Sequence, residues 1–153
     1  MDLDQIISTM RSNFEAQLIL CEELEAIADS LPSDIDTQKC LQASRTIFPA
    51  IKRAHDFEEN KVFPLLSADM GSSYGGAQPP LASSLERLRY EHWEDESFAE
   101  ELSDALARRI TDVANAETIG YMLRGFFEGL RRHIAFETDF ILPLLVKRLE
   151  AER

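Results

Sequence analysis

The stretch from Leu3 to Leu31, LDQIISTMRSNFEAQLILCEELEAIADSL, decides the fold class. Its apolar residues recur every three or four positions, which is the spacing of one buried face on an α-helix. The spacing holds to the end of the stretch, so it predicts one long helix, which Pro32 and Ser33 end. The residues of this face are Ile6, Ile7, Met10, Phe14, Leu18, Cys21, Leu24, Ala28 and Leu31.

Three further helices are expected along the chain. Residues 69–80, DMGSSYGGAQPP, are rich in glycine and proline and predict a loop. The sequence Ser83-Ser84-Leu85-Glu86 matches a capping box, so a helix is expected to start there. The expected helices run from Ser33 or Asp34 to about Ala68, from about Ser83 to about Val113 and from Asn115 to about Leu149, with kinks or bends at Pro49 and Pro143.

The whole chain, residues 1–153, is expected to form one all-α domain. Four helices of about 30 residues, each about 45 Å long, predict an up-down-up-down antiparallel four-helix bundle. An internal repeat supports two helical hairpins, because a shift of 78 residues superimposes His55 on His133 and Glu59 on Glu137. At the same shift the triplet Pro64-Leu65-Leu66 falls one residue short of Pro143-Leu144-Leu145.

Composition excludes several classes of partner. With 28 acidic and 16 basic residues the formal net charge is −12, which argues against binding nucleic acid or an anionic membrane surface. No apolar stretch approaches the roughly 20 residues that a membrane-spanning helix needs. The acidic N-terminal residues do not resemble a secretory signal, so a cytoplasmic location is expected. Cys21 and Cys40 are expected to be free, buried thiols, since the helical register offsets them by about 6 Å along the axis.

The histidines carry the strongest chemical signal. The chain has three histidines, and each is followed four residues later by a glutamate. Residues four apart share one face of a helix, and the predicted topology brings the three pairs to the same level within roughly 5 Å. All three lie on predicted core faces, where an unpaired carboxylate is costly unless a cation neutralises it. The sequence therefore predicts metal ligands at His55, Glu59, His92, Glu96, His133 and Glu137.

Ligand type limits the choice of metal. Imidazole and carboxylate without thiolate suit iron, manganese or zinc. Carboxylates on two different helices could bridge two ions, although neither the Glu-x-x-His pattern of ferritin-like bundles nor the His-Glu-x-x-His pattern of zinc proteases occurs. The alternative interpretation of any one such pair is an exposed hydrogen bond on a helix surface.

The spacing of these pairs resembles the hemerythrin-like, HHE cation-binding family over nearly the whole chain. The shared features are His-x3-Glu followed by VFPLL at 62–66, a second His-x3-Glu, and a third followed by LPL at 142–144. The resemblance implies a four-helix bundle with a non-haem di-iron centre, joined by an oxo or hydroxo bridge, that carries or senses oxygen or takes part in responses to iron, nitric oxide or peroxide. It implies that His55 binds one iron, that His92, Glu96 and His133 bind the other, and that Glu59 and Glu137 bridge them.

One departure from the family pattern concerns the first helix, where a further histidine is usual. The 78-residue shift places Phe14 opposite His92 and Leu18 opposite Glu96, and neither can bind a metal. We therefore expect an asymmetric centre, firm near His92, Glu96 and His133 and weak or absent near His55. Glu15 and Glu58 are alternative ligands, but helical geometry turns Glu15 about 100° away from residue 14. One metal or two remain open at this point.

The expected function is that of a cytoplasmic protein that binds iron and uses it to bind or sense oxygen or another small diatomic molecule. The alternatives are an iron-dependent oxidase or peroxidase with an open coordination position, and a regulatory bundle with a degenerate metal site. Trp93 points away from His92 and is expected either at a helix interface or at a homodimer contact. The pattern names no signalling partner.

Overall fold

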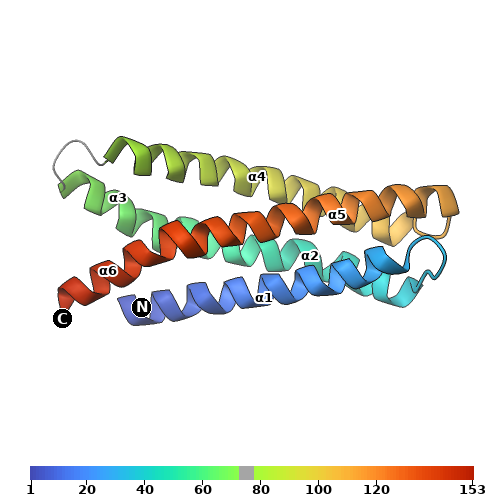
Figure 1. The fold of residues 1–153 in the computed structure, drawn as a ribbon, viewed down its shortest axis with the longest axis horizontal. Helices are drawn as coiled ribbons and strands as arrows, with labels where there is room; N and C mark the ends of the chain where they lie inside the picture. The colour runs from blue at the N-terminus through green and yellow to red at the C-terminus, as the bar shows by residue number, and fades with distance from the viewer. Residues whose placement is uncertain (73–77) are drawn as a thin grey trace.

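The computed structural model describes the backbone of residues 1–72 and 78–153 and the side chains of 1–68 and 81–153. Within these ranges the chain is helical except at short connections and at its ends, and it contains no strand (Figure 1). The segments are α1 (Leu3–Ser30), α2 (Thr37–Phe57), η1 (Glu58–Val62), α3 (Phe63–Ser72), α4 (Gln78–Arg108), α5 (Val113–Phe136), η2 (Glu137–Ile141) and α6 (Leu142–Glu152), where η marks a π-helical turn.

These segments form four long rods, namely α1, α2–η1–α3, α4 and α5–η2–α6. Helix α1 packs against α2 and α5, and α4 packs against the same two helices from the opposite side. Successive rods run in opposite directions, and both termini lie at the same end of the bundle (Figure 1). The predicted all-α, up-down-up-down four-helix bundle is confirmed.

Aspartate caps begin three of the helices. Asp2 forms a capping box with Gln5, and the Asp36 side chain accepts from the N–H of Lys39 at the start of α2. The Asp112 side chain accepts from the N–H of Ala114 at the start of α5. An aspartate oxygen satisfies one of the free N–H groups at a helix start. The starts predicted near Ser33 or Asp34 and at Asn115 were therefore off by a few residues.

The predicted start of the third helix at Ser83 is wrong, because α4 already begins at Gln78. Pro79 and Pro80 fall in its first turn, where the N–H groups have no partner within the helix and a proline removes no hydrogen bond. The same helix ends at Arg108 rather than near Val113. Of the predicted loop, residues 69–72 and 78–80 are helical, and 73–77 lie outside the described residues.

Two π-helical turns interrupt the second and fourth rods at equivalent places. In each, the residue before a proline donates its N–H to the carbonyl of a glutamate five positions earlier, Phe63 to Glu58 and Leu142 to Glu137. A proline has no N–H and its ring crowds the preceding turn, which favours a wider turn just before it. The two prolines are Pro64 and Pro143.

The π turn changes which residues face the core. Phe140 and Leu144 were expected on the core face with His133, but they are 62% and 36% exposed. Ile141 and Leu145 are buried in their place, because the extra residue in the turn rotates the following helix. The prolines therefore set the orientation of everything that follows them.

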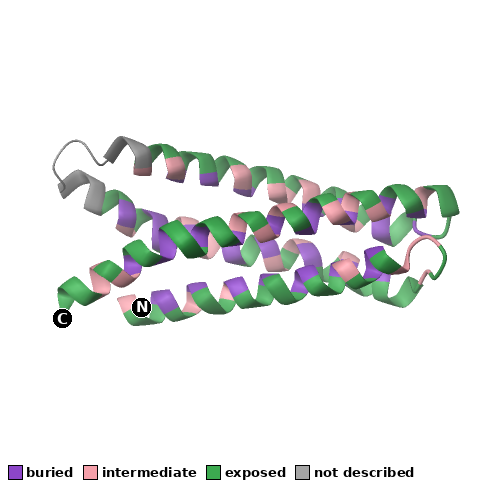
Figure 2. Ribbon diagram, viewed as in Figure 1, coloured by how far each residue is buried: buried purple, intermediate pink, exposed green. Residues whose placement is uncertain are grey.

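Buried side chains line the inner faces of all four rods (Figure 2). Both cysteines are free and buried, and the Cys21 thiol donates to the carbonyl of Phe127 at 3.7 Å. Trp93 is 63% exposed and lies beside Tyr90, so it is not at an interface between helices of this chain. None of the described helices has an apolar stretch long enough to cross a membrane.

Candidate metal centre

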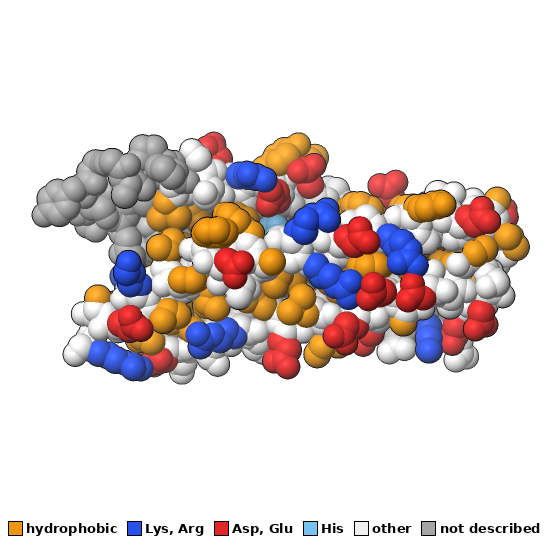
Figure 3. Space-filling model, in the orientation of Figure 1, with side chains coloured by type: hydrophobic (Ala, Val, Ile, Leu, Met, Phe, Trp, Pro, Cys, Tyr) orange, Lys and Arg blue, Asp and Glu red, His pale blue; other side chains and the backbone are white. Residues whose placement is uncertain are grey.

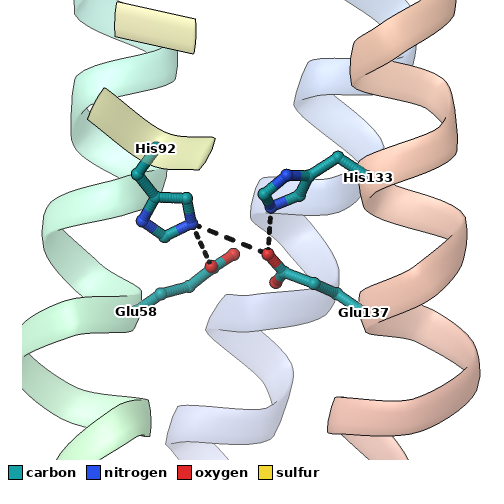
Figure 4. Close-up of side chains that lie close together, drawn as sticks. All are labelled: Glu58, His92, His133 and Glu137. Atoms are coloured by element: carbon teal, nitrogen blue, oxygen red, sulfur yellow. Dashed lines mark hydrogen bonds and ion pairs between the residues drawn. The ribbon is translucent and has the colours of Figure 1, made fainter. Parts of the chain in front are cut away.

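Four side chains from three rods meet in the middle of the bundle. They are Glu58 from η1, His92 from α4, His133 from α5 and Glu137 from η2 (Figure 4). Each offers one ligand atom, and these atoms all lie within 4.8 Å of one another. Both glutamates stand at the first position of a π turn, so the same backbone device places a carboxylate in each hairpin.

Contacts between imidazole Nε2 and carboxylate oxygens join the histidines to the glutamates of this cluster, and the carboxyls of Glu58 and Glu137 also contact each other. The Nε2 atom of His92 lies 3.1 Å from Oε2 of Glu58 and 3.7 Å from Oε1 of Glu137. His133 contacts Oε1 of Glu137 through its own Nε2 atom. The ring of His55 stacks on that of His92, with centroids 3.8 Å apart and planes at 5°. Three imidazoles and two carboxylates therefore share one small volume.

Several buried polar atoms at this point lack a hydrogen bond. Nε2 of His55 and Oε2 of Glu137 have no partner, whereas Nε2 of His92 and Oε2 of Glu58 face each other at 3.1 Å and have no partner outside the cluster; within the described residues the only other such atom is Oγ of Ser103. A buried polar atom without a partner costs about 1–3 kcal/mol, and native proteins contain few. Nitrogen and oxygen lone pairs gathered at one place are what a cation would satisfy. The donor set therefore fits a metal ion.

The outward nitrogen of each histidine faces a carboxylate from another helix. Nδ1 of His55 is 3.1 Å from Oε2 of Glu96, and Nδ1 of His92 is 3.4 Å from Oε2 of Glu59. The two pairs are crossed, because each histidine is held by the glutamate that follows the other one in sequence. A carboxylate at Nδ1 keeps the proton there and leaves Nε2 as a lone-pair donor for a metal.

The third histidine has the same kind of support. Nδ1 of His133 lies 3.5 Å from Oε2 of Glu91 and 3.7 Å from Oδ2 of Asp95, both on α4. On the opposite side of the site, Nζ of Lys52 lies 3.1 Å from Oε1 of Glu96. Hydrogen bonds to Asp56 and Glu96 raise the pKa of Lys52 above its usual value. Glu96 is thus held by a cation on one oxygen and by an imidazole on the other.

The pKa values of the two buried carboxyls move apart. Burial and the charge of Glu137 raise the pKa of Glu58 well above its usual value. Burial would also raise the pKa of Glu137, but hydrogen bonds from His133 and His92 outweigh it and lower the value to about 2. Two carboxylates this close do not both ionise readily, so one keeps its proton until a cation replaces it.

The pKa values of the two stacked histidines also move apart. Burial, followed by the charges of His92 and His133, lowers the pKa of His55 to about 2. Burial opposes protonation of His92 as well, but its bonds to Glu137 and Glu58 raise the pKa to about 10. Without a metal, the cluster therefore holds a proton on His92 where a cation would otherwise sit.

The structure places the six residues predicted from sequence in two layers. His92, His133 and Glu137 belong to the four-residue cluster. Glu59 and Glu96 lie one layer farther out, against Nδ1 atoms, and His55 stacks on the cluster with Nε2 unpartnered. The first-helix positions Phe14, which is buried, and Leu18, which is 39% exposed, offer no ligand.

Glu58 is the cluster member that does not lie four residues after a histidine, so the sequence pattern gave it only as an alternative ligand. A signal for it exists in the sequence. Glu58 precedes Pro64 by six residues, just as Glu137 precedes Pro143 by six. The histidines of the internal repeat are 78 residues apart, but the two prolines are 79 apart. Glu58 and Glu137 are also 79 apart, so Glu58 aligns with Glu137 when the prolines are aligned.

The crossed pairs generate a prediction for the outer glutamates. Replacing Glu59 or Glu96 by glutamine is expected to weaken metal binding by about 10–100-fold, because the anionic partner that fixes the Nδ1 proton is lost. The measurement is a competitive titration of Mn(II) or Zn(II) against a chelating dye. Glu100→Gln, an exposed position on α4, serves as the control and should bind as the wild type does. Unchanged affinity in both outer variants would show that these contacts do not orient the histidines.

Comparison with known proteins agrees with this geometry. Residues 5–145 match the family model described as the hemerythrin HHE cation binding domain. A search of curated proteins gave no match, and neither did a search of solved structures. The matched range covers nearly the whole chain and contains every residue of the cluster. The chain therefore belongs to the hemerythrin HHE cation-binding domain family.

Proposed function

We propose that this protein holds one iron ion at Glu58, His92, His133 and Glu137 and uses it to bind dioxygen or a similar small molecule. The observation that carries the proposal is that ligand atoms of these four residues lie within 4.8 Å of one another in the core, with Oε2 of Glu137 and the neighbouring Nε2 of His55 left without a partner. Two imidazoles with two carboxylates and no thiolate suit iron, with manganese and zinc as the alternatives. Membership of a cation-binding family supports the same choice.

Some residues of this chain would bind the ion, and others would orient its ligands or exclude water from it. The four cluster residues would hold the ion, and Glu59, Glu96, Glu91 and Asp95 would keep the imidazoles turned toward it. An iron ion with an open coordination position supplies reversible binding of a small diatomic molecule. The ring of Phe63, 5.6 Å from that of His92, and the buried aliphatic residues around it exclude water.

A single firmly held ion follows from the asymmetry between the hairpins. A second ion beside His55 would have that imidazole as its only terminal ligand, because α1 presents Phe14 and Leu18 at the equivalent positions. Glu96, the nearest carboxylate to His55, is already held by Lys52. We therefore assign the firm site to the four-residue cluster and expect a second site, if it fills at all, to be weak.

One observation favours the second candidate function, an iron-dependent oxidase or peroxidase. A cavity of about 440 Å³ lies between α4 and α5, and His133 is part of its wall. A diatomic molecule needs far less space, since a water molecule occupies about 30 Å³. The cavity would admit an organic substrate to the neighbourhood of the metal. Turnover of peroxide by the iron-loaded protein would distinguish this candidate from simple binding.

The metal-to-chain ratio tests the proposal. Protein loaded anaerobically with Fe(II), desalted and analysed by elemental mass spectrometry is expected to hold about one iron per chain. Glu58→Gln should hold close to none, while Glu100→Gln should match the wild type. A ratio near two would contradict the single site and favour a di-iron centre. A ratio near zero for iron, manganese and zinc would contradict metal binding and favour a regulatory bundle.

The folding of Glu58→Gln is checked in the metal-free form. The raised pKa of Glu58 means that the fold resists its ionisation, so replacing it by a neutral amide is expected to leave the unfolding free energy equal or about 1 kcal/mol higher. A variant that keeps its fold and loses its metal identifies a ligand. A variant that unfolds would show that Glu58 has a structural role.

Metal uptake is expected to release protons. His92 is protonated in the metal-free protein at neutral pH, since its pKa is raised to about 10, and a metal ligand must be deprotonated. The apparent affinity should therefore rise with pH, by about tenfold per unit for each displaced proton. Titrations with Mn(II) between pH 6.5 and 8 measure the slope. An affinity independent of pH would contradict the protonated cluster.

A further inference from the structure

Side chains of both helices line the cavity between α4 and α5. Its α4 residues recur along one face, and so do its α5 residues, so the cavity follows the groove between the two helices. Figure 3 shows a small area of histidine surface in this region, with acidic and basic side chains around it. The lining residues are Ser84, Arg87, Leu88, Glu91, Asp95, Gly129, Arg132, His133 and Phe136.

Gly129 is one reason for the hollow. A Cβ atom built there would meet Nη2 of Arg132 at 3.8 Å, which is ordinary contact. The backbone there has no positive φ, so the position does not require glycine for conformational reasons. A Cβ atom at 129 would therefore fit at the cavity wall without a clash, and a longer side chain would begin from that wall.

The charges in the cavity are unevenly compensated. Glu91 pairs with Arg87 at 3.0 Å and lies near Nδ1 of His133, and Asp95 lies near the same nitrogen. Arg132 has no hydrogen bond or ion pair to any described side chain, although its guanidinium reaches over Gly129. The lining holds two arginines and two acids, and the exposed Arg132 is the one charged member of it without a partner among the described residues.

The rest of the lining is Ser84 and two apolar residues, Leu88 and Phe136. Leu88 is only 1% exposed, so Phe136, which is 37% exposed, supplies most of the accessible apolar surface. A guanidinium binds a carboxylate with two parallel hydrogen bonds, and an apolar wall favours a hydrocarbon or aromatic body. The volume of about 440 Å³ lies in the range of small-molecule sites.

We propose that this cavity binds a small organic carboxylate, with the carboxylate on Arg132 and the apolar body against Phe136. The proposal deepens the proposed function, on which the placement of this ligand beside an iron ion rests. Because His133 belongs both to the cavity wall and to the metal cluster, the bound molecule would lie next to the metal ligand. The Arg132 contact itself needs no metal.

The experiment uses benzoate as the probe and benzamide as its uncharged counterpart. Binding to the full chain is measured by calorimetry and by ¹⁵N chemical shifts, first in metal-free protein and then after loading with Fe(II). Benzoate is expected to bind at least tenfold more tightly than benzamide. Arg132→Gln should weaken benzoate at least tenfold and leave benzamide unchanged. Arg124→Gln is the control, since Arg124 lies on the same helix but pairs with Asp29.

A second variant fills the cavity. Gly129→Leu is expected to keep or raise the helix stability, because leucine is a better helix former than glycine, and to abolish binding of both probes. Retained benzoate binding in Gly129→Leu, equal binding in Arg132→Gln, or no binding of benzoate to the wild type would each overturn the proposal. If benzoate binds through Arg132 but iron is not retained, the iron proposal alone fails. If iron is retained and benzoate does not bind, the cavity proposal alone fails.

Discussion

Glu58 and Glu137 bring two carboxylates into contact in an apolar core, and the other residues of the site offset the cost of burying their charge. Burial opposes a charge on either group, and each opposes a charge on the other. The imidazoles of His92 and His133 offset this cost only in part, because Oε2 of Glu137 has no partner and Oε2 of Glu58 faces only Nε2 of His92. A divalent cation would neutralise the carboxylates and accept the free lone pairs. The buried polar cluster in the described part of the chain is therefore also suited to a metal.

The π turns explain how the two carboxylates come together. Each hairpin contains a glutamate six residues before a proline, and the turn between them places the glutamate at the same level of the bundle. The outer layer is shared between the hairpins in a different way, through the crossed contacts of His55 with Glu96 and of His92 with Glu59. These contacts tie α2 to α4 and orient the imidazoles. Backbone geometry thus positions the carboxylates, and side-chain pairing positions the histidines.

Much of this could be predicted from sequence, and the differences near the site follow from the π turns. Helical spacing was enough for the four rods, for the convergence of the histidines and for Glu137, because these depend on regular helices. The selection of Glu59 before Glu58 assumed that the helix continues unchanged past His55, and the ligand role of Glu59 stays a prediction while its carboxylate contacts Nδ1 of His92. The expected burial of Phe140 assumed the same past His133 and is wrong. A π turn breaks that assumption locally while leaving the overall pattern intact. The starts of α2 and α5 differ because Asp36 and Asp112 are the caps, and α4 starts earlier because prolines fit its first turn. The cavity at Gly129 depends on packing that periodicity does not describe.

The central claim is that one ion is held by Glu58, His92, His133 and Glu137. The most direct measurement is a crystal structure of the Fe(II)-loaded protein with anomalous differences collected at the iron absorption edge. The account predicts one strong peak within bonding distance of these four side chains, with Glu59 and Glu96 contacting Nδ1 atoms and not the metal. Two peaks of equal strength, or one peak bonded to Glu59 and Glu96, would contradict it.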